Sequence, residues 1–561
     1  MRFAFFAATA LLLAVAQPMG RQAAAASAER PNIVVIMTDD MGYSDLGCFG
    51  GEIATPNIDS LAGGGVRFRE FYNCSRCCQT RASLLTGYYA QRVGMDEFGR
   101  TMDLTVPTVA ERLQEAGYHT AMSGKWHLSE LPDEPRGDKR LKWMDHQLQL
   151  DMPLADPKSL PTRRGFEQFY GIVWGVVNHF DPFSLCEGET PVEEVPEDYY
   201  STDAITDYTE KYIREFAADD KPFFIYTAYT APHWPIQAPP ESIEKYQGKY
   251  ADGWDALRAE RFRRQVELGL FDEDTPLGPV INDGAPWRRL PAERRAYLAA
   301  KMAVHAAMID RIDVGVGRIV DALRETGQLD NTIILVLSDN GASPEIPGGP
   351  GYDRYAETRE GQPALREAKL QEGDNIRKLG SEESYAGIGS PWASAVNTPL
   401  RYWKMESYDG GCRTPLIVHW PRGLKGTPGR IVSDVGHVID LAPTMLELAG
   451  VNDVESLKLD GTSLTPVLGG ETIPGERTLF FAHYDGRGVR NGRWKASKLP
   501  RGEWELFDIE QDPGETTDIS AQHPEQLKRL VRGMSTWRQT STVRPVAPGE
   551  DATAAPATTL P

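Results

Sequence analysis

The chain has 561 residues, of which 41% are hydrophobic, 9% aromatic and 25% charged. This composition is typical of a soluble globular protein, and it excludes a disordered, collagenous or multi-span membrane chain. The length predicts two domains, because single hydrophobic cores rarely grow past about 250 to 300 residues. With 60 Lys and Arg against 80 Asp and Glu, the formal net charge is -20, which disfavours nucleic acid as a partner.

The first residues predict an export signal. Arg2 precedes an apolar stretch from Phe3 to Ala16, and Ala26-Ser27-Ala28 is the small-x-small pattern of a signal-peptidase site. About 14 apolar residues are too few to span a hydrocarbon core of roughly 30 Å, which argues against a membrane anchor. We therefore expect a signal peptide over residues 1–28 and a periplasmic or secreted protein without stable membrane insertion.

Five short apolar runs predict buried parallel strands. Helical patterns lie between them, most clearly at Thr108 to Ala116 and at Tyr297 to Leu323. Alternation of this kind predicts a doubly wound α/β sheet. The five runs are Ile33 to Met37, Tyr118 to Met122, Phe223 to Tyr229, Thr332 to Leu337 and Pro415 to His419.

Polar segments follow four of these runs at the point where each run ends. Each segment alone is ordinary turn or N-cap chemistry. In an open parallel sheet, however, ligands bind in the crevice beyond the carboxyl ends of the strands, so four strands would deliver ionisable groups to one crevice. The segments are Thr38-Asp39-Asp40, Ser123-Gly124-Lys125-Trp126-His127, Thr230-Ala231-Pro232-His233 and Ser338-Asp339-Asn340-Gly341.

The pattern changes near Glu471. Short strands are predicted at Leu479 to His483, at Val489 to Ala496 with an interruption at Asn491-Gly492, and at Glu505 to Asp508, followed by a helix from Pro524 to Arg538. We expect a catalytic domain over residues 29–470 and a smaller α+β domain with an antiparallel sheet over 471–545. The last residues, 546–561, are rich in Ala, Pro and Thr and predict a disordered tail.

The six cysteines, at positions 48, 74, 77, 78, 186 and 412, are sparse for an exported chain of this size, so disulfides are at most accessory. A CxxC spacing at Cys74 and Cys77 could mean a redox pair or half a zinc site, but no second CxxC completes a zinc tetrad. Cys77 runs directly into a helix-forming stretch. At a helix N-terminus it could be a thiolate nucleophile, with Arg81 one turn along, or a buried structural cysteine.

The segment from Cys77 to Gly87 resembles the signature of the formylglycine-dependent sulfatases, which is Cys-x-Pro-Ser-Arg followed by a short helix and Thr-Gly. Six further blocks match the family in the same order. The resemblance implies an alkaline-phosphatase-like fold, in which helices sandwich a large, mixed, mostly parallel sheet, and a sulfuric ester hydrolase that converts aryl or carbohydrate sulfates to an alcohol and inorganic sulfate. The six blocks are Asn32–Gly47, Gly124–His127, Ala231–Trp234, Ser338–Gly341, Asn397–Trp420 and Leu506–Pro513.

The resemblance implies a calcium ion held by Asp39, Asp40, Asp339 and Asn340, with one oxygen from the modified Cys77. Carboxylate and amide oxygens are the ligands that a hard divalent cation prefers. No set of Cys and His lies among these four residues, which disfavours zinc.

The resemblance also implies a role for each remaining group. A formylglycine-generating maturation enzyme would oxidise Cys77 to an aldehyde whose hydrate is the nucleophile, held by Arg81, while Asp339 takes up its proton. His127 would remove the proton of the second hydroxyl and so expel sulfate. The sulfate oxygens and the bridging oxygen would be bound by Lys125, His233 and Lys404, with His233 or Lys404 assisting departure of the alcohol.

Two positions depart from the family pattern. Gln79 stands where the family has Pro, less often Ala, and Asp409 stands where Glu is commoner before Gly-Gly. The maturation enzyme reads the signature while it is extended, so we expect Gln79 to bear on the efficiency of modification and not on the fold.

Two other functions remain open. Relatives on the same scaffold hydrolyse phosphonate or phosphate esters, and an unmodified Cys77 would leave a protein that binds sulfated glycans. Retention of every acid, base and cation argues against such a binding protein. The substrate, a sulfated small molecule or glycan, stays open too, because aromatic residues between Ala342 and Glu406 could stack on sugars or pack the loops. They are Tyr352, Tyr355, Tyr385, Trp392, Tyr402 and Trp403.

Overall fold

The computed structural model describes residues 30–541 apart from 131–154, 176–177, 183, 193, 283, 348–364 and 474. The predicted signal peptide, the predicted tail, Tyr352 and Tyr355 therefore lie outside the described residues. Within the described ranges, no helix is both long and apolar enough to cross a bilayer.

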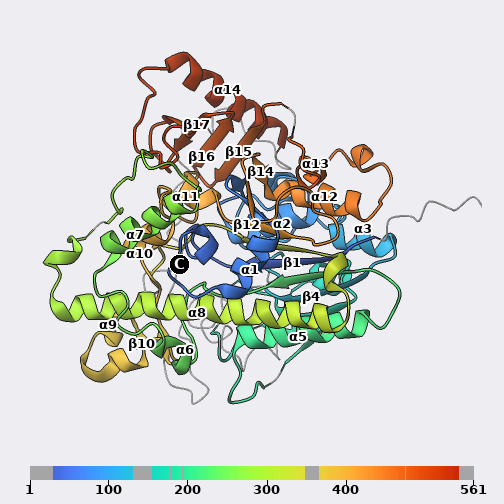
Figure 1. The fold of residues 1–561 in the computed structure, drawn as a ribbon, viewed down its shortest axis with the longest axis horizontal. Helices are drawn as coiled ribbons and strands as arrows, with labels where there is room; N and C mark the ends of the chain where they lie inside the picture. The colour runs from blue at the N-terminus through green and yellow to red at the C-terminus, as the bar shows by residue number, and fades with distance from the viewer. Residues whose placement is uncertain are drawn as a thin grey trace, which may run out of the picture.

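A ten-stranded sheet forms the centre of the larger part of the molecule (Figure 1). Its middle is parallel: Ile33 of β1 (Asn32–Thr38) lies opposite Phe224 of β8 (Phe223–Ala228) and Ile333 of β9 (Thr332–Ser338). The prediction of a mixed, mostly parallel sheet is confirmed. The strand order is β13 (Arg430–Val432), β2 (Val66–Phe68), β12 (Leu416–His419), β9, β1, β8, β4 (His119–Gly124), β5 (Gln168–Ile172), β6 (Leu185–Glu187) and β7 (Thr190–Pro191).

The prediction that Pro415 to His419 is a parallel strand is wrong, because β12 runs antiparallel to both β9 and β2. Burial and branched side chains are the same for either direction, so the apolar run does not reveal it. The connection sets the direction. Gly341, just beyond the end of β9, donates its N–H to the carbonyl of Gly411 at 3.1 Å, so the chain enters β12 beside the end of β9 and runs back along it.

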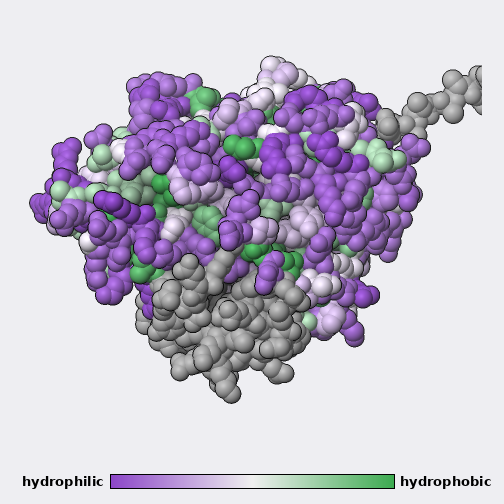
Figure 2. Space-filling model, turned by 90° about the horizontal axis from the view of Figure 1, so that it is seen from below, coloured by the Kyte–Doolittle hydropathy of each residue, from purple (hydrophilic) through white to green (hydrophobic). Residues whose placement is uncertain are grey.

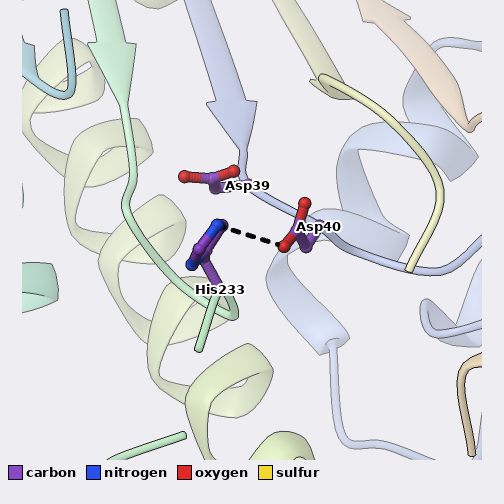
Figure 3. A group of neighbouring side chains, drawn as sticks. All are labelled: Asp39, Asp40 and His233. Atoms are coloured by element: carbon purple, nitrogen blue, oxygen red, sulfur yellow. Dashed lines mark ion pairs between the residues drawn. The ribbon is translucent and has the colours of Figure 1, made fainter. Parts of the chain in front are cut away.

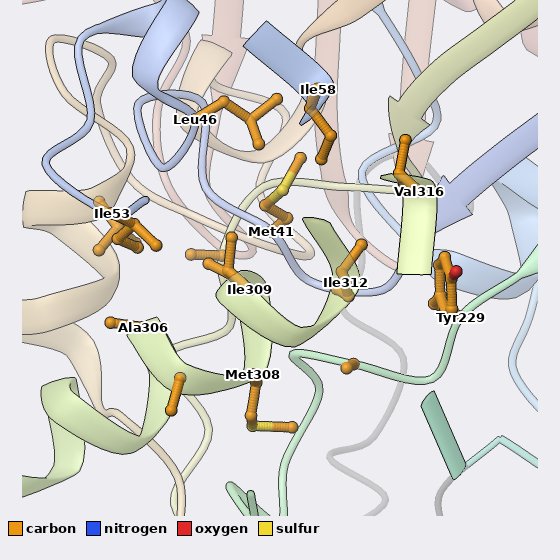
Figure 4. Packing of buried hydrophobic residues seen from close by; sticks show 14 of the residues in the cluster. Met41, Leu46, Ile53, Ile58, Tyr229, Ala306, Met308, Ile309, Ile312 and Val316 are labelled. Atoms are coloured by element: carbon orange, nitrogen blue, oxygen red, sulfur yellow. The ribbon is translucent and has the colours of Figure 1, made fainter. Parts of the chain in front are cut away.

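Side chains of β1 alternate between two buried layers, as the two-residue period of a strand requires. Val34 and Ile36 belong to the layer that contains Ile309, Ile312 and Val316 of the long helix α8 (Figure 4). Ile33, Val35 and Met37 belong to the opposite layer. Helices α8 (Ala292–Glu325), α5 (Ser201–Phe216) and α1 (Pro56–Gly64) cover the first face, and α2 (Cys77–Thr86), α3 (Val109–Glu115) and α12 (Leu441–Leu448) cover the second (Figure 1).

A side-chain cap marks the start of α3, whereas α8 starts earlier than its apolar pattern predicts. Thr108 caps α3 by accepting the backbone N–H of Glu111, whose side chain in turn accepts the N–H of Thr108, a capping box. Helix α8 is longer than its apolar pattern from Tyr297 to Leu323, because it begins directly after Pro291 with a polar first turn.

A separate four-stranded antiparallel sheet lies near the C-terminus, as predicted. The Asn491-Gly492 interruption lies in the turn between its two middle strands, and Leu530, Met534 and Trp537 of the last helix pack on the sheet. Figure 2 views the molecule from below and shows a mostly hydrophilic face with small, scattered hydrophobic spots. The elements are β15 (Thr478–His483), β16 (Gly486–Asn491), β17 (Trp494–Lys498), β18 (Glu505–Asp508) and α14 (Pro524–Ser541).

A buried group of charges joins this small sheet to the larger part, and we call it the interface cluster (Tyr72, Asp409, Arg413, Lys495 and Glu515). Lys495 forms an ion pair with Asp409, and its Nζ lies 3.0 Å from Glu515 Oε1. Asp409 Oδ2 also accepts the Tyr72 hydroxyl at 3.0 Å and Arg413 Nη1 at 3.3 Å. These contacts hold β17 against the short helix α11 (Asp409–Cys412).

Candidate active site

Four strand ends deliver polar side chains to one edge of the sheet. Asp39 and Asp40 follow β1, Lys125 and His127 follow β4, His233 follows β8, and Asp339 and Asn340 follow β9. Cys77 and Arg81 come from α2, and Lys404 comes from the segment before α11. The structure brings all ten predicted site residues together in one buried group, which contacts link throughout.

Figure 3 shows Asp39 and Asp40 where β1 ends, with His233 beside them; Asp339 and Asn340 follow the neighbouring strand β9. Asp40 Oδ1 accepts Asn340 Nδ2 at 2.6 Å, and Asp339 Oδ1 accepts the backbone N–H of Asp40 at 3.3 Å. Asp39, Cys77 and Asp339 each offer one ligand atom, all within 4.8 Å of one another, and Asp39, Asp40 and His233 do the same. Asp39 Oδ1 and Asn340 Oδ1 are buried and accept no hydrogen bond from any described residue, so these oxygens suit a hard cation.

Burial and neighbouring charges shift the pKa values of the three carboxyl groups in different directions. Burial, opposed by Lys404 and reinforced by Asp39, raises the pKa of Asp40 to about 7. Burial also raises the pKa of Asp39, but the charges of Lys125 and Arg81 oppose it, and that pKa is lowered to about 2. Burial and the Asp39 charge hold the pKa of Asp339 well above its ordinary value. Crowded acids of this kind are relieved when a cation binds among them.

Cys77 begins α2, and its sulfur faces His127. Cys77 Sγ lies 3.4 Å from His127 Nδ1. The hydrogen bond from the Cys78 thiol and the charges of Lys125 and Lys404 outweigh burial and lower the pKa of Cys77 well below its ordinary value. All six cysteines are free and buried, so the chain uses no disulfide.

Arg81 lies one turn into α2 and is fully buried. Its Nη2 and Nε donate to Asp339 Oδ2 at 2.7 and 3.1 Å, and its Nη1 donates to the carbonyl of Lys125 at 3.0 Å. Arg81 therefore fixes Asp339 beside Cys77 and ties the end of β4 to α2.

Two lysines, Lys125 and Lys404, pair with the carboxylates of Asp39 and Asp40. Lys125 Nζ donates to Asp39 Oδ2 at 2.5 Å. Lys404 Nζ donates to Asp40 Oδ2 at 2.9 Å and to His233 Nε2 at 3.1 Å, and it lies 3.2 Å from Glu345 Oε2. Both side chains are almost completely buried, so they place positive charge where water is excluded.

The tautomer of His233 follows from its contacts. Its Nδ1 lies 2.5 Å from the carbonyl oxygen of Trp234, which can only accept, so Nδ1 carries the proton. Burial and the charge of Lys404 hold the pKa of His233 well below its ordinary value. The neutral ring therefore accepts the Lys404 hydrogen bond at Nε2.

His127 is held tightly but keeps one nitrogen open. Its backbone is in the left-handed region with φ of 59°, and its ring contacts Phe98 at 5.3 Å between centroids. A Cβ added to Gly175 would lie only 2.4 Å from the imidazole, so no side chain fits at that position. Its Nε2 is buried and makes no hydrogen bond within the described part of the chain, and burial lowers the pKa of His127 to about 4.

Glu345, which was not predicted from the sequence, also pairs with Lys404. Its Oε2 accepts Trp234 Nε1 at 2.8 Å and the Ser343 hydroxyl at 2.9 Å. Burial raises its pKa, but the charges of Lys404 and Arg76 outweigh burial and lower it to about 2. A single Glu in a long loop carries no distinguishing signal. Of the loop aromatics, Tyr385 and Trp392 are 2% and 0% exposed, so these two pack the structure.

Comparison with known proteins agrees with this geometry. The Sulfatase family model matches residues 31–451, and the model for the C-terminal part of N-sulphoglucosamine sulphohydrolase matches residues 401–539. The chain is 34% identical over 471 residues to an arylsulfatase of Klebsiella aerogenes, covering 80% of this chain and 93% of that one. It is 32% identical over 557 residues to an uncharacterized sulfatase of Schizosaccharomyces pombe, covering 90% and 93%.

A solved structure is also similar. Ps i-CgsB in complex with k-i-k-neocarrahexaose superposes with a TM-score of 0.62 at 25% identity, covering 91% of this chain and 92% of that one. A phosphonate monoester hydrolase, SpPMH from Silicibacter pomeroyi, superposes with a TM-score of 0.54 at 20% identity, covering 92% and 97%, which shows a shared fold alone. The chain belongs to the Sulfatase family, and it is a sulfuric ester hydrolase.

Proposed function

We propose that the protein hydrolyses aryl or carbohydrate sulfate esters with a formylglycine derived from Cys77 and a calcium ion. The observation that carries the proposal is the convergence of Cys77, Asp39 and Asp339, whose ligand atoms lie within 4.8 Å of one another at the start of a helix and at two strand ends. A nucleophile in contact with a cation site, with two lysines beside it, is suited to attack on an anionic ester.

Four residues would hold the calcium ion: Asp39, Asp40, Asp339 and Asn340. The buried, unpartnered oxygens Asp39 Oδ1 and Asn340 Oδ1 support this ligand set, because such atoms are costly to leave unpaired. A bound calcium ion would supply positive charge that offsets the three carboxylates and polarises oxygens brought to it.

Different residues around Cys77 would carry out the two proton transfers of the reaction. Oxidation of Cys77 by the maturation enzyme and its oxidant would replace the thiol with an aldehyde, and addition of water to that aldehyde would supply the hydroxyl nucleophile. Asp339, fixed by Arg81, would take up the proton of that hydroxyl, and Arg81 would steady the hydrate from the same helix. His127 Nδ1, 3.4 Å from Cys77 Sγ, is within reach to take the second proton and release sulfate.

Lys125, His233 and Lys404 would bind the sulfate group. His233 Nε2 accepts from Lys404 and its Nδ1 proton is committed to the carbonyl of Trp234, so the neutral ring has no proton to give. We therefore assign protonation of the leaving alcohol to Lys404 and the aiming of Lys404 to His233.

The test compares chemistry at Cys77 with turnover. Intact-mass measurement of the Cys77 peptide should show formylglycine, and the purified protein should release sulfate from an aryl sulfate faster than phosphate from the matching aryl phosphate or phosphonate. An unmodified thiol without turnover would indicate a glycan-binding protein. Faster phosphonate turnover would assign the site to the other ester class.

The role of His127 has its own signature. His127→Ala should give a burst of about one equivalent of alcohol per site and then very slow turnover, because the base for sulfate release is missing while the first transfer is intact. Lys125→Ala should give no burst, since it weakens the first step by about 2.7 to 4 kcal/mol. A stopped-flow trace with an aryl sulfate separates the two, and a His127 variant without a burst would place this residue in the first step.

A further inference from the structure

Two buried polar side chains beside the crevice have no role in the proposed chemistry. Arg76 is the N-cap residue of α2, directly before Cys77, and is 9% exposed. Its guanidinium makes no hydrogen bond or ion pair with any described residue, and its Nε is buried. Its Cζ lies 5.2 Å from the centroid of the Phe98 ring.

The second side chain is His483, the last residue of β15 in the small sheet. It is 3% exposed, and neither ring nitrogen has a hydrogen-bond partner among residues 30–541 as described. Its ring stacks obliquely on Tyr484 at 4.5 Å, and Tyr484 is 49% exposed. Burial and the charges of Arg76 and Arg487 lower the pKa of His483 to about 3, so the neutral ring offers one N–H donor and one acceptor.

Both residues flank the catalytic group. The Phe98 ring lies beside the Arg76 guanidinium, and it also contacts the His127 ring, with 5.3 Å between the two ring centroids. The carbonyl of Ser75 accepts the backbone N–H of Met405 at 2.8 Å, so the chain before Arg76 is bound to the chain after Lys404. Gln91, in the chain just after α2, donates its side-chain Nε2 to the carbonyl of Ala482 at 3.0 Å, so the end of β15 that carries His483 lies against this part of the crevice wall. The charges of Cys77 and Lys404 also act on the pKa of His483.

The two cations at this flank are paired unequally. Lys404 has Asp40 and Glu345 within 3.2 Å of its Nζ, whereas Arg76 feels the charge of Glu345 but has no carboxylate within 4 Å among the described residues. Its Nε is buried without a described partner, and a polar atom in that position is costly unless a ligand pairs with the guanidinium. Its planar fork matches the oxygens of a carboxylate or sulfate, and a neutral imidazole N–H can donate to the same group.

We propose that Arg76 and His483 form a subsite for a second anionic group, a carboxylate or a sulfate, carried by the alcohol part of the sulfate ester. This inference rests on the proposed function and narrows it, since the preferred substrates are dianionic. The first anion is the sulfate that is cleaved, and the second one is bound and retained. The subsite draws one residue from each part of the molecule, so the small sheet takes part in selecting the substrate.

The test uses substrates that differ only in the second charge. They are an aryl sulfate with a carboxylate on its ring, the methyl ester of the same compound, and the matching aryl disulfate, each as its ring-position isomers. For the wild-type protein we expect kcat/KM to be at least about 10-fold higher for one isomer of the carboxylate or disulfate than for the methyl ester, mainly through KM. In His483→Ala and Arg76→Gln this ratio should fall towards one, with turnover of the methyl ester changed by less than about 3-fold.

Controls separate binding from maturation and folding. Arg76 adjoins the maturation signature, so rates are expressed per formylglycine measured by mass, and His483 lies outside that signature. Arg532→Gln and His523→Ala replace exposed residues of the same small part and should leave the ratio unchanged. An unchanged ratio in both test variants, or an equal loss for all substrates, would overturn the subsite. Preference for the carboxylate or for the disulfate identifies the second anion.

A binding measurement keeps this inference separate from the proposed function. In Cys77→Ala protein, which cannot turn over, the favoured dianionic compound should bind about 10-fold more tightly than the methyl ester, and His483→Ala in that background should remove the difference. Absence of turnover in wild type together with this binding difference would overturn the proposed chemistry and support the subsite. Equal affinities would overturn the subsite alone.

Discussion

The interface cluster and the catalytic crevice both bury many charges, and they differ in how those charges are paired. Lys495 and Lys404 are equally buried, and each contacts two carboxylates. In the interface cluster the carboxylates are also held by Arg413, Tyr72 and backbone, with Asp409 N–H donating to Glu515 at 2.7 Å. In the crevice Asp39 Oδ1, Asn340 Oδ1 and His127 Nε2 have no described partner. Buried charge by itself therefore does not mark a site. In the crevice three atoms without described partners belong to one connected group, whereas in the interface cluster Glu515 Oε1 has no described hydrogen-bond partner but lies 3.0 Å from Lys495 Nζ.

The largest effect should come from the nucleophile. Cys77→Ala should reduce sulfatase activity by at least about 1000-fold, because it removes the attacking group while the rest of the crevice remains. Its melting temperature should change little. Activity is measured with an aryl sulfate and folding by calorimetry. Cys78→Ala is the matched control and should keep much of the activity, and the reverse pattern would mean that the signature is aligned wrongly.

The interface cluster should respond in stability. Lys495→Met leaves Glu515 buried without its cation and Asp409 with Arg413 alone, which should lower the free energy of unfolding by about 3 to 5 kcal/mol. Adding Glu515→Gln should recover part of that loss, since it removes the carboxylate that has lost its cation. Denaturant unfolding of the single and double variants measures both. A Lys495→Met protein as stable as wild type would show that the cluster does not bind the two parts together.

Removing the metal should affect the catalytic crevice and leave the contacts of the interface cluster unchanged. Exhaustive chelation should abolish most of the activity and lower the stability by about 2.7 kcal/mol relative to protein at 100 times the calcium Kd, because the ligand binds only the folded state. The Lys495→Met variant should show the same chelation shift, as its lesion lies elsewhere. Full activity in protein verified as metal-free would exclude the calcium assignment.

The smallest effect concerns Glu406, whose Oε2 is buried without a described partner. Burial raises the pKa of Glu406 to about 7 from 4.5, so its ionised form destabilises the fold and wild-type stability should fall as pH rises from 5 to 8. Glu406→Gln lacks this loss. Its melting temperature should match wild type near pH 5 and exceed it by about 2 to 4 °C at pH 8. A difference that does not vary with pH would contradict this origin.

The sequence was most informative where local chemistry decides the outcome. The buried strand β1, the helix that starts at Thr108 and the Asn491-Gly492 interruption depend on neighbours in the chain, and all three are present as expected. Polar residues after strand ends converge because the carboxyl ends of parallel strands share one edge. The direction of β12 could not be predicted, since it depends on a contact between Gly341 and Gly411, and Glu345 and His483 acquire their surroundings only through tertiary folding.

The two margins of the large sheet have a consequence for association between copies of the protein. Its central strands have six or seven residues, whereas β13 at one margin has three and β7 at the other has two, one of which is Pro191. An edge strand exposes backbone N–H and C=O groups that can template pairing with another chain, and short strands or prolines limit this pairing. The edge strands of the large sheet therefore expose few backbone groups for pairing with another chain. We expect the protein to resist aggregation through strand pairing at these edges, even in concentrated solution.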